Sequence, residues 1–531
     1  MKTITVYDTT LRDGTQGAGV SFSLQDKLDI ARRLDDLGVH YIEAGYPVSN
    51  EKDEAVFAEL AKMPLRRAVP VAFGMTRRVG VRAKDDETLR SLLAAETPAV
   101  ALVAKSWDFH VTKVLRTSLD ENLAMVRDSV RLMKEAGRAV FFDAEHFFDG
   151  YSANPTYALS VLRTALEAGA DWLILCDTNG GRLPEEIAET TAAVAREMGG
   201  RLGIHCHNDT GLAVANTLAA VRAGCTQVQG TINGLGERCG NADLCAVMAN
   251  LELKMGYRCV GHDNLVKLTD VARFVYDTAN MLTAPGQPYV GPSAFAHKGG
   301  MHVAAVTRDR RTYEHADPAL VGNTRRILVS ELSGRGTILT KVSGTRFEAD
   351  AALQKKVLKE VQRLENQGYQ FENAEASFAL LVRRLAQRAT PFFELDHYSV
   401  AIKKDNTREP VTEATVKLRV GKAWQHTVAE GDGPVNALDG ALRKALLPVY
   451  PGLAGMSLTD YKVRVINSGA GTAARVRVVI ESRDADEHWG TVGVSENIID
   501  ASWQALVDSI EYKLTKDRER SAGARESKTS T

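Results

Sequence analysis

The chain has 531 residues, 44% of them hydrophobic and 25% charged, which is typical of a folded protein with two or three domains. Its 66 Lys and Arg residues balance 67 Asp and Glu residues, so no overall positive field favours nucleic acid or an anionic membrane. No apolar run approaches the ~20 residues of a membrane span, so we expect a protein that binds neither nucleic acid nor a membrane. The six cysteines form no C-x-x-C pair, and we expect them to be reduced thiols in a cytoplasmic protein.

From residue 3 to about residue 255, short apolar segments alternate with amphipathic ones at a period of roughly 30 residues. The amphipathic segments begin at Ser or Asp and end at Gly, as helices do. The apolar segments are continuous, which is typical of parallel strands covered by helices. The eight expected strands cover residues 4–8, 39–45, 69–74, 99–104, 139–145, 171–177, 202–207 and 226–232. Eight strand–helix units predict an α/β fold, a (β/α)₈ TIM barrel over residues 1–261, with its site at the carboxyl ends of the strands.

After the barrel, residues 262–390 have a mostly helical pattern, interrupted by a turn-rich segment at 283–302 that we expect to cover the barrel mouth. Residues 391–516 change to alternating strands and predict a C-terminal α+β domain of two βββα halves, suited to regulation and to contacts in a homodimer. The last residues, 517–531, contain no apolar residue larger than alanine, and we expect them to be disordered.

Two histidines form the strongest single signal, in the segment GIHCHND at residues 203–209. Side chains two apart on a strand share a face, so His205 and His207 should both point into the barrel while Cys206 points to the helices. Two imidazoles at the carboxyl end of a strand form half of a divalent metal site. A purely structural pair of histidines is the alternative.

Two further residues can complete this metal site. Asp13 is expected at the end of the first strand, which lies one strand away from the seventh in a closed barrel, and it can supply a carboxylate ligand. By itself, a turn residue in RDG would be the simpler interpretation. Asn241, just after the eighth strand, can add an amide oxygen, although a helix N-cap explains it equally well.

Charged side chains flank the expected metal site. Arg12 cannot lose its charge, so it is suited to stabilising an oxyanion, or alternatively to a structural ion pair with Glu43. Glu43 and Glu145 are expected at the ends of strands two and five, where each can act as acid or base or hold Arg12 in place. Ordinary solvated charges are the alternative for both.

Two polar positions lie in loops. Thr178, in the segment CDTNGG, can bind a small carboxylate with its hydroxyl, or it forms a simple turn. His297, in the turn-rich segment, can serve as a general base near neutral pH. His302 and Tyr313 lie close to it in the sequence, and the sequence does not decide which of the three reaches the site.

Several long motifs occur in one order along the chain: DTTLRDGTQ, IEAGYP, DTNGG, IHCHNDTGLAVANT, GTINGLGERCGNADL and SAFAHKGGMHVAAV. In these motifs the chain resembles the acyl-CoA Claisen-condensing barrel enzymes, the 2-isopropylmalate, homocitrate and citramalate synthases. The resemblance implies a divalent cation (Mn, Mg, Zn or Co) bound by four residues, and it extends to an allosteric C-terminal domain. The implied ligands are Asp13, His205, His207 and Asn241.

The resemblance also implies roles in catalysis. Arg12 matches the oxyanion-stabilising arginine, Glu145 an active-site acid and His297 a base. Gln16 and Thr178, with Arg12, match contacts to the oxo acid.

The segment DTNGG, where most relatives have DTVG, is similar to the citramalate synthase branch, which condenses acetyl-CoA with pyruvate in isoleucine biosynthesis. That branch implies a C-terminal domain that binds isoleucine or leucine as an effector. The alternatives are an enzyme of the same fold that uses 2-oxoisovalerate or 2-oxoglutarate, a lyase, or a non-catalytic amino-acid sensor.

Overall fold

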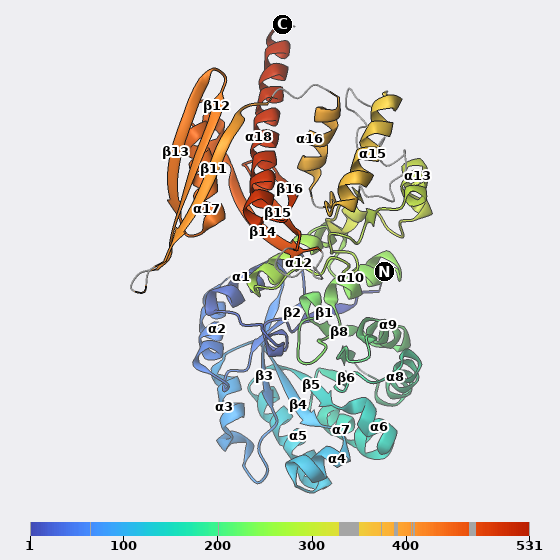
Figure 1. The fold of residues 1–531 in the computed structure, drawn as a ribbon. Coiled ribbons are helices and arrows are strands. Elements are labelled where there is room, and N and C mark those ends of the chain that lie inside the picture. Colours follow the sequence, from blue (N-terminus) through green and yellow to red (C-terminus); the bar gives the residue numbers. More distant parts are fainter. Residues whose placement is uncertain are drawn as a thin grey trace. The chain divides into compact units, whose positions relative to one another are not determined.

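The computed structural model describes residues 2–529 except 64, 200, 329–349, 373, 387–390, 405, 407–408 and 467–473. The chain divides into two compact units. The first unit contains Met1–Phe295 and His315–Arg325, and the second contains Ala296–Glu314 and Arg326–Thr531. Figure 1 follows the chain from the blue and green elements of the first unit to the orange and red elements of the second.

Eight parallel strands form a closed barrel in the first unit, with each strand paired to the next and β8 paired to β1. This confirms the predicted (β/α)₈ fold. The strands are β1 (Thr5–Asp8), β2 (Tyr41–Gly45), β3 (Val69–Met75), β4 (Ala99–Lys105), β5 (Ala139–Glu145), β6 (Trp172–Asp177), β7 (Leu202–Cys206) and β8 (Gln227–Gly230).

A helix follows each strand, and the local sequence explains its ends. Helix α1, for example, begins after Ser23, which forms a reciprocal capping box with Asp26, and ends at Gly38 in the left-handed conformation. The main helices are α1 (Leu24–Leu37), α2 (Glu51–Lys62), α3 (Glu87–Ala94), α5 (Leu119–Glu135), α7 (Pro155–Glu167), α8 (Pro184–Met198), α9 (Ala213–Ala223) and α10 (Leu244–Leu253). Shorter turns are η1 (Gly14–Gln16), η2 (Ala83–Asp85), α4 (Asp108–His110), η3 (Val111–Leu115), α6 (Phe147–Ala153) and η4 (Ile232–Gly234).

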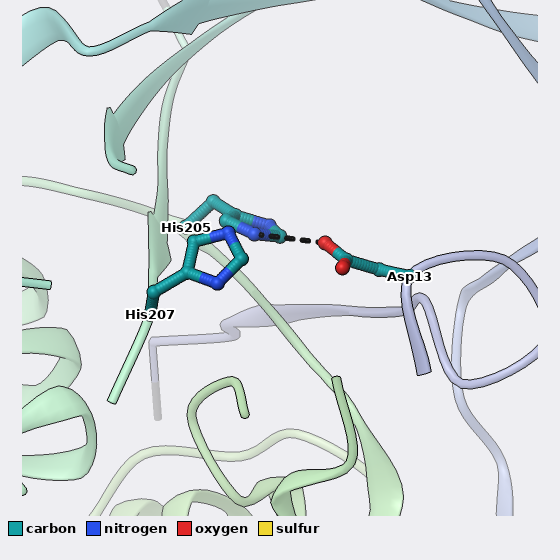
Figure 2. Close-up of side chains that lie close together, drawn as sticks. All are labelled: Asp13, His205 and His207. Atoms are coloured by element: carbon teal, nitrogen blue, oxygen red, sulfur yellow. Dashed lines mark ion pairs between the residues drawn. The ribbon is translucent and has the colours of Figure 1, made fainter. Parts of the chain in front are cut away.

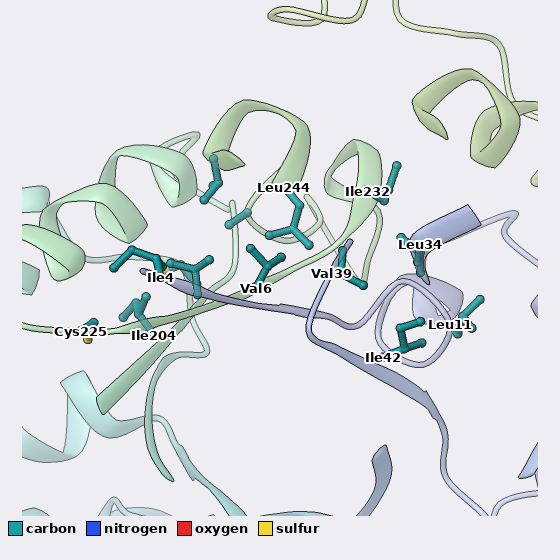
Figure 3. Packing of buried hydrophobic residues seen from close by; sticks show 14 of the residues in the cluster. Ile4, Val6, Leu11, Leu34, Val39, Ile42, Ile204, Cys225, Ile232 and Leu244 are labelled. Carbon is teal, nitrogen blue, oxygen red and sulfur yellow. The ribbon is translucent and has the colours of Figure 1, made fainter. Parts of the chain in front are cut away.

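The main core lies between the barrel and the helices (Figure 3). Val6 of β1 and Ile42 of β2 are fully buried there with Leu34 of α1, and each such side chain contributes about 1.5–3 kcal/mol. On β7, Ile204 and Cys206 belong to this outer core, so the residue between them points into the barrel. This confirms the predicted orientation of Cys206. Within the barrel a separate cluster packs, consisting of Tyr7, Val71, Ala99, Ala101, Phe141, Trp172, Ile174 and Cys176.

The first unit continues beyond the boundary expected at residue 261. Helix α12 (Leu268–Thr278) buries Leu268, Val271 and Val275 in the same core as the barrel helices. The remaining elements of this unit are α11 (His262–Leu265) and η6 (Pro318–Val321). An apolar face on α12 therefore extends the barrel unit to Phe295.

The second unit contains the two predicted βββα halves. Each half contains one antiparallel sheet, in the order β11-β12-β13 in the first half and β14-β15-β16 in the second. In the first half, alternate residues of β12, such as Val416 and Leu418, pack with Leu438 and Leu442 of α17. The two halves are β11 (Glu394–Lys403), β12 (Val411–Val420), β13 (Ala423–Gly431) and α17 (Pro434–Leu446), then β14 (Ser457–Val465), β15 (Val476–Arg483), β16 (His488–Ser495) and α18 (Ile498–Thr529). Preceding or connecting elements are β9 (Ala296–His297), α13 (Gly300–Arg308), η5 (Arg310–Thr312), β10 (Arg326–Ile327), α15 (Ala351–Asn366), α16 (Glu375–Leu385) and η7 (Pro451–Gly455).

The tail differs from the expectation of disorder, because α18 continues to Thr529. Arg, Glu and Ala favour a helix without any burial of apolar surface, and Lys513 pairs with Asp517 one turn away. Arg520 also pairs with Asp486 before β16. None of the helices in the described part of the chain is long and apolar enough to cross a membrane.

Candidate metal centre and active site

Three predicted ligands converge at the carboxyl end of the barrel (Figure 2). His205 lies on β7, His207 directly follows that strand, and Asp13 comes from the loop after β1. One possible ligand atom from each residue lies within 4.8 Å of the other two. His205 Nε2 lies 3.3 Å from Asp13 Oδ2, and all three side chains are buried. The structure therefore brings together the set predicted from the sequence.

The position of Asp13 is corrected in one respect. Strand β1 ends at Asp8, so Asp13 lies beyond the strand, at the start of η1. The loop between them is held by the Thr9 N–H, which donates to the Gly230 carbonyl at 2.8 Å. The Asp13 side chain makes no capping hydrogen bond to η1 within the described residues, so the role of a simple turn residue does not explain it.

Unpartnered polar atoms show that these residues fit a cation. Asp13 Oδ1, His207 Nδ1 and Asn241 Oδ1 are buried and have no hydrogen-bond partner among the described residues. Leaving such an atom unpaired costs about 1–3 kcal/mol. A carboxylate, two imidazoles and an amide oxygen are ligands that divalent cations such as Mn²⁺, Co²⁺ or Zn²⁺ accept. A bound cation would satisfy these atoms together.

The surroundings of Asn241 favour the role of ligand over that of a helix cap. Helix α10 is capped by Asp243, whose side chain accepts from the Cys245 N–H at 2.9 Å. Asn241 instead pairs with His207 in an isolated bridge and donates from Nδ2 to the Leu235 carbonyl at 3.0 Å. Its amide oxygen thereby has no hydrogen-bond partner in the part of the chain that the structure describes.

The protonation states of Asp13 and His207 suit metal binding. Burial would lower the pKa of His205, but its hydrogen bond to Asp13 raises that pKa, so a bound cation would displace one proton from this ring. Burial alone would raise the pKa of Asp13, but Arg12 and His205 hold that pKa well below its ordinary value. Burial, with the neighbouring His205, lowers the pKa of His207 to about 4. At neutral pH Asp13 is therefore an anion and His207 is neutral, which are the forms that bind a metal.

Arg12 is held beside the ligands by a buried carboxylate. Its Nε donates to Glu43 Oε1 at 2.5 Å, and its Nη1 lies 3.4 Å from Asp13 Oδ2. The guanidinium carbon lies 3.9 Å from the centroid of the Phe73 ring. Burial would lower the pKa of Arg12, but Glu43 and Asp13 raise it, so the charge persists. The predicted ion pair with Glu43 thus exists and also positions Arg12 at the site.

Glu43 is corrected from a strand-end position to the middle of β2. Its side chain is fully buried, and its second oxygen accepts from the Tyr7 hydroxyl at 2.6 Å. The alternative of a solvated surface charge is therefore wrong for Glu43. The sequence analysis missed Tyr7 and Phe73, because an aromatic residue in an apolar strand is indistinguishable from ordinary core.

Three further predicted residues lie at the carboxyl ends of strands. Glu145 ends β5, as predicted, and pairs with Lys105, the last residue of β4, which the sequence analysis missed. Thr178 follows β6, and its hydroxyl accepts from the His146 N–H at 2.8 Å. Gln16 lies at the end of η1 with an exposed side chain. These positions are compatible with their predicted roles and do not test them.

His297 belongs to the second unit, so its role as a base remains a prediction. Its side chain is buried, and Nε2 lies 3.1 Å from Glu314 Oε1. In the same unit His302, on α13, is exposed and stacks on Tyr313 with ring centroids 4.0 Å apart.

A closed eight-stranded barrel with two histidines, a carboxylate and an amide oxygen at its carboxyl end, beside a partly buried arginine, defines a metal-dependent barrel enzyme. Comparison with family models agrees with this class. The HMGL-like model matches residues 3–275, the homocitrate synthase post-HMGL domain-like model residues 289–369, and the LeuA allosteric (dimerisation) domain model residues 372–514. The chain belongs to the HMGL-like family.

Relatives that match nearly the whole chain include (R)-citramalate synthases and a 2-isopropylmalate synthase. The chain is 52% identical to the (R)-citramalate synthase of Aquifex aeolicus, with 97% of this chain and 98% of the relative covered. It is also 52% identical to the (R)-citramalate synthase of Geobacter sulfurreducens, over 98% of this chain and 99% of that one. The 2-isopropylmalate synthase of Methanocaldococcus jannaschii is 32% identical, over 96% and 95%.

Proposed function

We propose that this chain is an (R)-citramalate synthase, which condenses acetyl-CoA with pyruvate to give (R)-citramalate and CoA. One observation carries the proposal: the buried set of Asp13, His205 and His207 beside Arg12 occurs in a chain similar to proteins of that name along nearly its whole length. The 32% identity to a 2-isopropylmalate synthase makes the same reaction with another 2-oxo acid the weaker alternative.

Particular side chains can be given a part in the steps of this reaction. Asp13, His205, His207 and Asn241 would hold a divalent cation, which supplies Lewis-acid polarisation of the pyruvate carbonyl when bound. A base takes a proton from the methyl group of acetyl-CoA, and the resulting enolate forms a carbon–carbon bond to C2 of pyruvate. Arg12 stabilises the negative charge that then develops on the former ketone oxygen. Protonation of that oxygen, followed by attack of water on the thioester, releases citramalate and CoA.

The base comes from the segment 296–314 in this proposal, with His297 as the residue predicted from the sequence. Its burial against Glu314 limits its reach, because a base must come within about 2.6–3.2 Å of the proton it removes. Because the His302 side chain is exposed and stacks on Tyr313, we prefer His302 as the base.

Release of CoA thiol from acetyl-CoA tests the function. We expect turnover with pyruvate that exceeds turnover with 2-oxoisovalerate and 2-oxoglutarate, and that is abolished by a chelator and restored by a divalent cation. A higher rate with another oxo acid would reassign the substrate. Absence of thiol release with every acid, in the presence of metal, would favour the non-catalytic sensor.

We propose that the citramalate formed by this protein serves isoleucine biosynthesis. We also propose that the protein is a cytoplasmic homodimer that assembles through its C-terminal domain. The match to the LeuA allosteric (dimerisation) domain model supports the dimer. All six cysteines are free thiols, five of them buried, which supports a reducing compartment.

A cavity in the second unit supports an amino-acid effector, isoleucine or leucine. It has a volume of about 330 Å³ between α15, α16, β16 and α18. The wall is largely apolar, and at one side Arg384 pairs with Asp508 at 2.7 Å while Ser377 donates to Asp508 at 2.6 Å. An ammonium group suits Asp508, a carboxylate suits Arg384, and an aliphatic side chain suits the remaining wall.

Filling this cavity should remove inhibition. We expect Leu381→Trp, which adds bulk to the cavity wall, to raise the isoleucine concentration needed for half inhibition of thiol release by at least about tenfold, a loss of about 1.4 kcal/mol of binding. Val449→Trp, at an exposed position of the same unit, serves as the control and should be inhibited normally. Normal inhibition of Leu381→Trp would place the effector elsewhere.

A further inference from the structure

A buried glutamine contacts the ring of His205 from the side away from Asp13. Strands β7 and β8 pair in parallel with His205 opposite Gln229, and both side chains point into the barrel. His205 Nδ1 lies 3.1 Å from Gln229 Oε1, and Gln229 is 1% exposed. Gln229 is neither a predicted ligand nor part of any motif singled out in the sequence.

The contact decides which ring nitrogen carries the proton. A neutral imidazole has one N–H, and an amide oxygen accepts hydrogen bonds without donating any. With Oε1 of Gln229 against it, Nδ1 must be the protonated nitrogen. Nε2 lies 3.3 Å from Asp13 Oδ2, and when a cation takes the place of the proton shared there, the lone pair of Nε2 is the one presented to it.

The orientation of the glutamine amide is itself determined by neighbours. Gln229 Nε2 donates to Gln227 Oε1 at 3.2 Å. A reversed amide would turn its oxygen towards this acceptor and a donor towards His205 Nδ1.

We propose that Gln229 is a positioning residue that holds His205 in the tautomer protonated on Nδ1 and so presents the Nε2 lone pair to the cation. The inference rests on the proposed metal centre but is independent of which oxo acid the enzyme uses. Outer partners of this kind typically change metal affinity about 10–100-fold.

The test measures metal binding by the full chain without substrate. Isothermal titration of the metal-stripped protein with Mn²⁺ should give a Kd about 10–100-fold higher for Gln229→Met, which keeps the volume and loses the acceptor. Gln229→Glu, which keeps an acceptor oxygen, should bind Mn²⁺ close to normally. Gln287→Met is the matched control, because Gln287 is also buried but bonds to Asn233 and Asp243, and its Kd should not change.

A second measurement reports the tautomer directly. With Zn²⁺ bound, the ring ¹⁵N resonances of His205, assigned by their absence in His205→Gln, should show protonated Nδ1 and ligated Nε2 in the unsubstituted chain and a mixture of the two arrangements in Gln229→Met. An unchanged Kd in Gln229→Met, or an equal loss in Gln229→Glu, would overturn the proposal. If the unsubstituted chain bound no Mn²⁺, the metal centre itself would be wrong, which is a result distinct from failure of Gln229 alone.

Discussion

Asp13→Ala should leave the protein without bound metal and lower turnover of pyruvate by roughly 10³-fold or more. Asp13 is the one anion among the four proposed ligands, and its buried Oδ1 has no hydrogen-bond partner within the described ranges of the chain. Without it, two imidazoles and an amide hold the cation weakly. Metal catalysis is worth several kcal/mol, and each 1.36 kcal/mol is tenfold in rate. Metal content after dialysis, by mass spectrometry, and CoA thiol release are the two measurements.

Asp29→Ala provides the control for this variant. Asp29 lies exposed on α1, where it pairs with Arg32, so its loss should change neither metal content nor rate. Full metal content in Asp13→Ala would show that another group is the ligand. Full metal content with lost activity would instead assign Asp13 a role in the reaction alone.

Substitution of the general base should give the second large effect. We expect His302→Ala to lower kcat by ~10²–10⁴-fold with little change in the KM for pyruvate, because proton removal from acetyl-CoA is affected and pyruvate binding is not. His297→Ala should lower kcat less and should lower the thermal stability of the protein, since it leaves the buried Glu314 without this histidine.

The comparison of these two variants separates the candidates. A large fall in kcat for His297→Ala, with stability retained, would restore His297 as the base predicted from the sequence. If both variants turned over normally, the base would lie outside the segment 296–314. Tyr313→Phe, which keeps the stacked ring beside His302, tests whether the hydroxyl takes part.

Most of the fold could be predicted from the sequence because its signals are local. Continuous apolar runs identified all eight strands, and the capping box at Ser23 marked the start of α1. Alternation along β7 predicted that His205 points inward and Cys206 outward. The helical tail was missed because the absence of apolar residues was taken as disorder, whereas a helix that extends an already packed one needs little further burial.

The contacts within the site were less predictable. The contact between His205 and Gln229 joins two strands, so it depends on barrel register, which no local pattern encodes. The pair of Arg12 with Glu43 could be named from the sequence only as an alternative to a role beside the metal, whereas the structure shows Arg12 in contact with both Glu43 and Asp13. Sequence reasoning could place these residues on the inner face of the barrel, but not decide which atoms meet. Lys105 could be recognised from the sequence only weakly, as a charged residue at the end of the apolar run AVALVAK.

The proposed metal ligands come from opposite ends of the barrel sequence, Asp13 from the first βα unit and His205 to Asn241 from the last two. The loop that carries Asp13 is joined to the end of β8 where the Ile232 N–H donates to the Thr10 hydroxyl at 2.8 Å. During synthesis, therefore, the proposed site would be incomplete until the eighth strand has emerged and closed against the first. A bound cation would link the first and last strand–helix units, so that opening the barrel would also require releasing the ion.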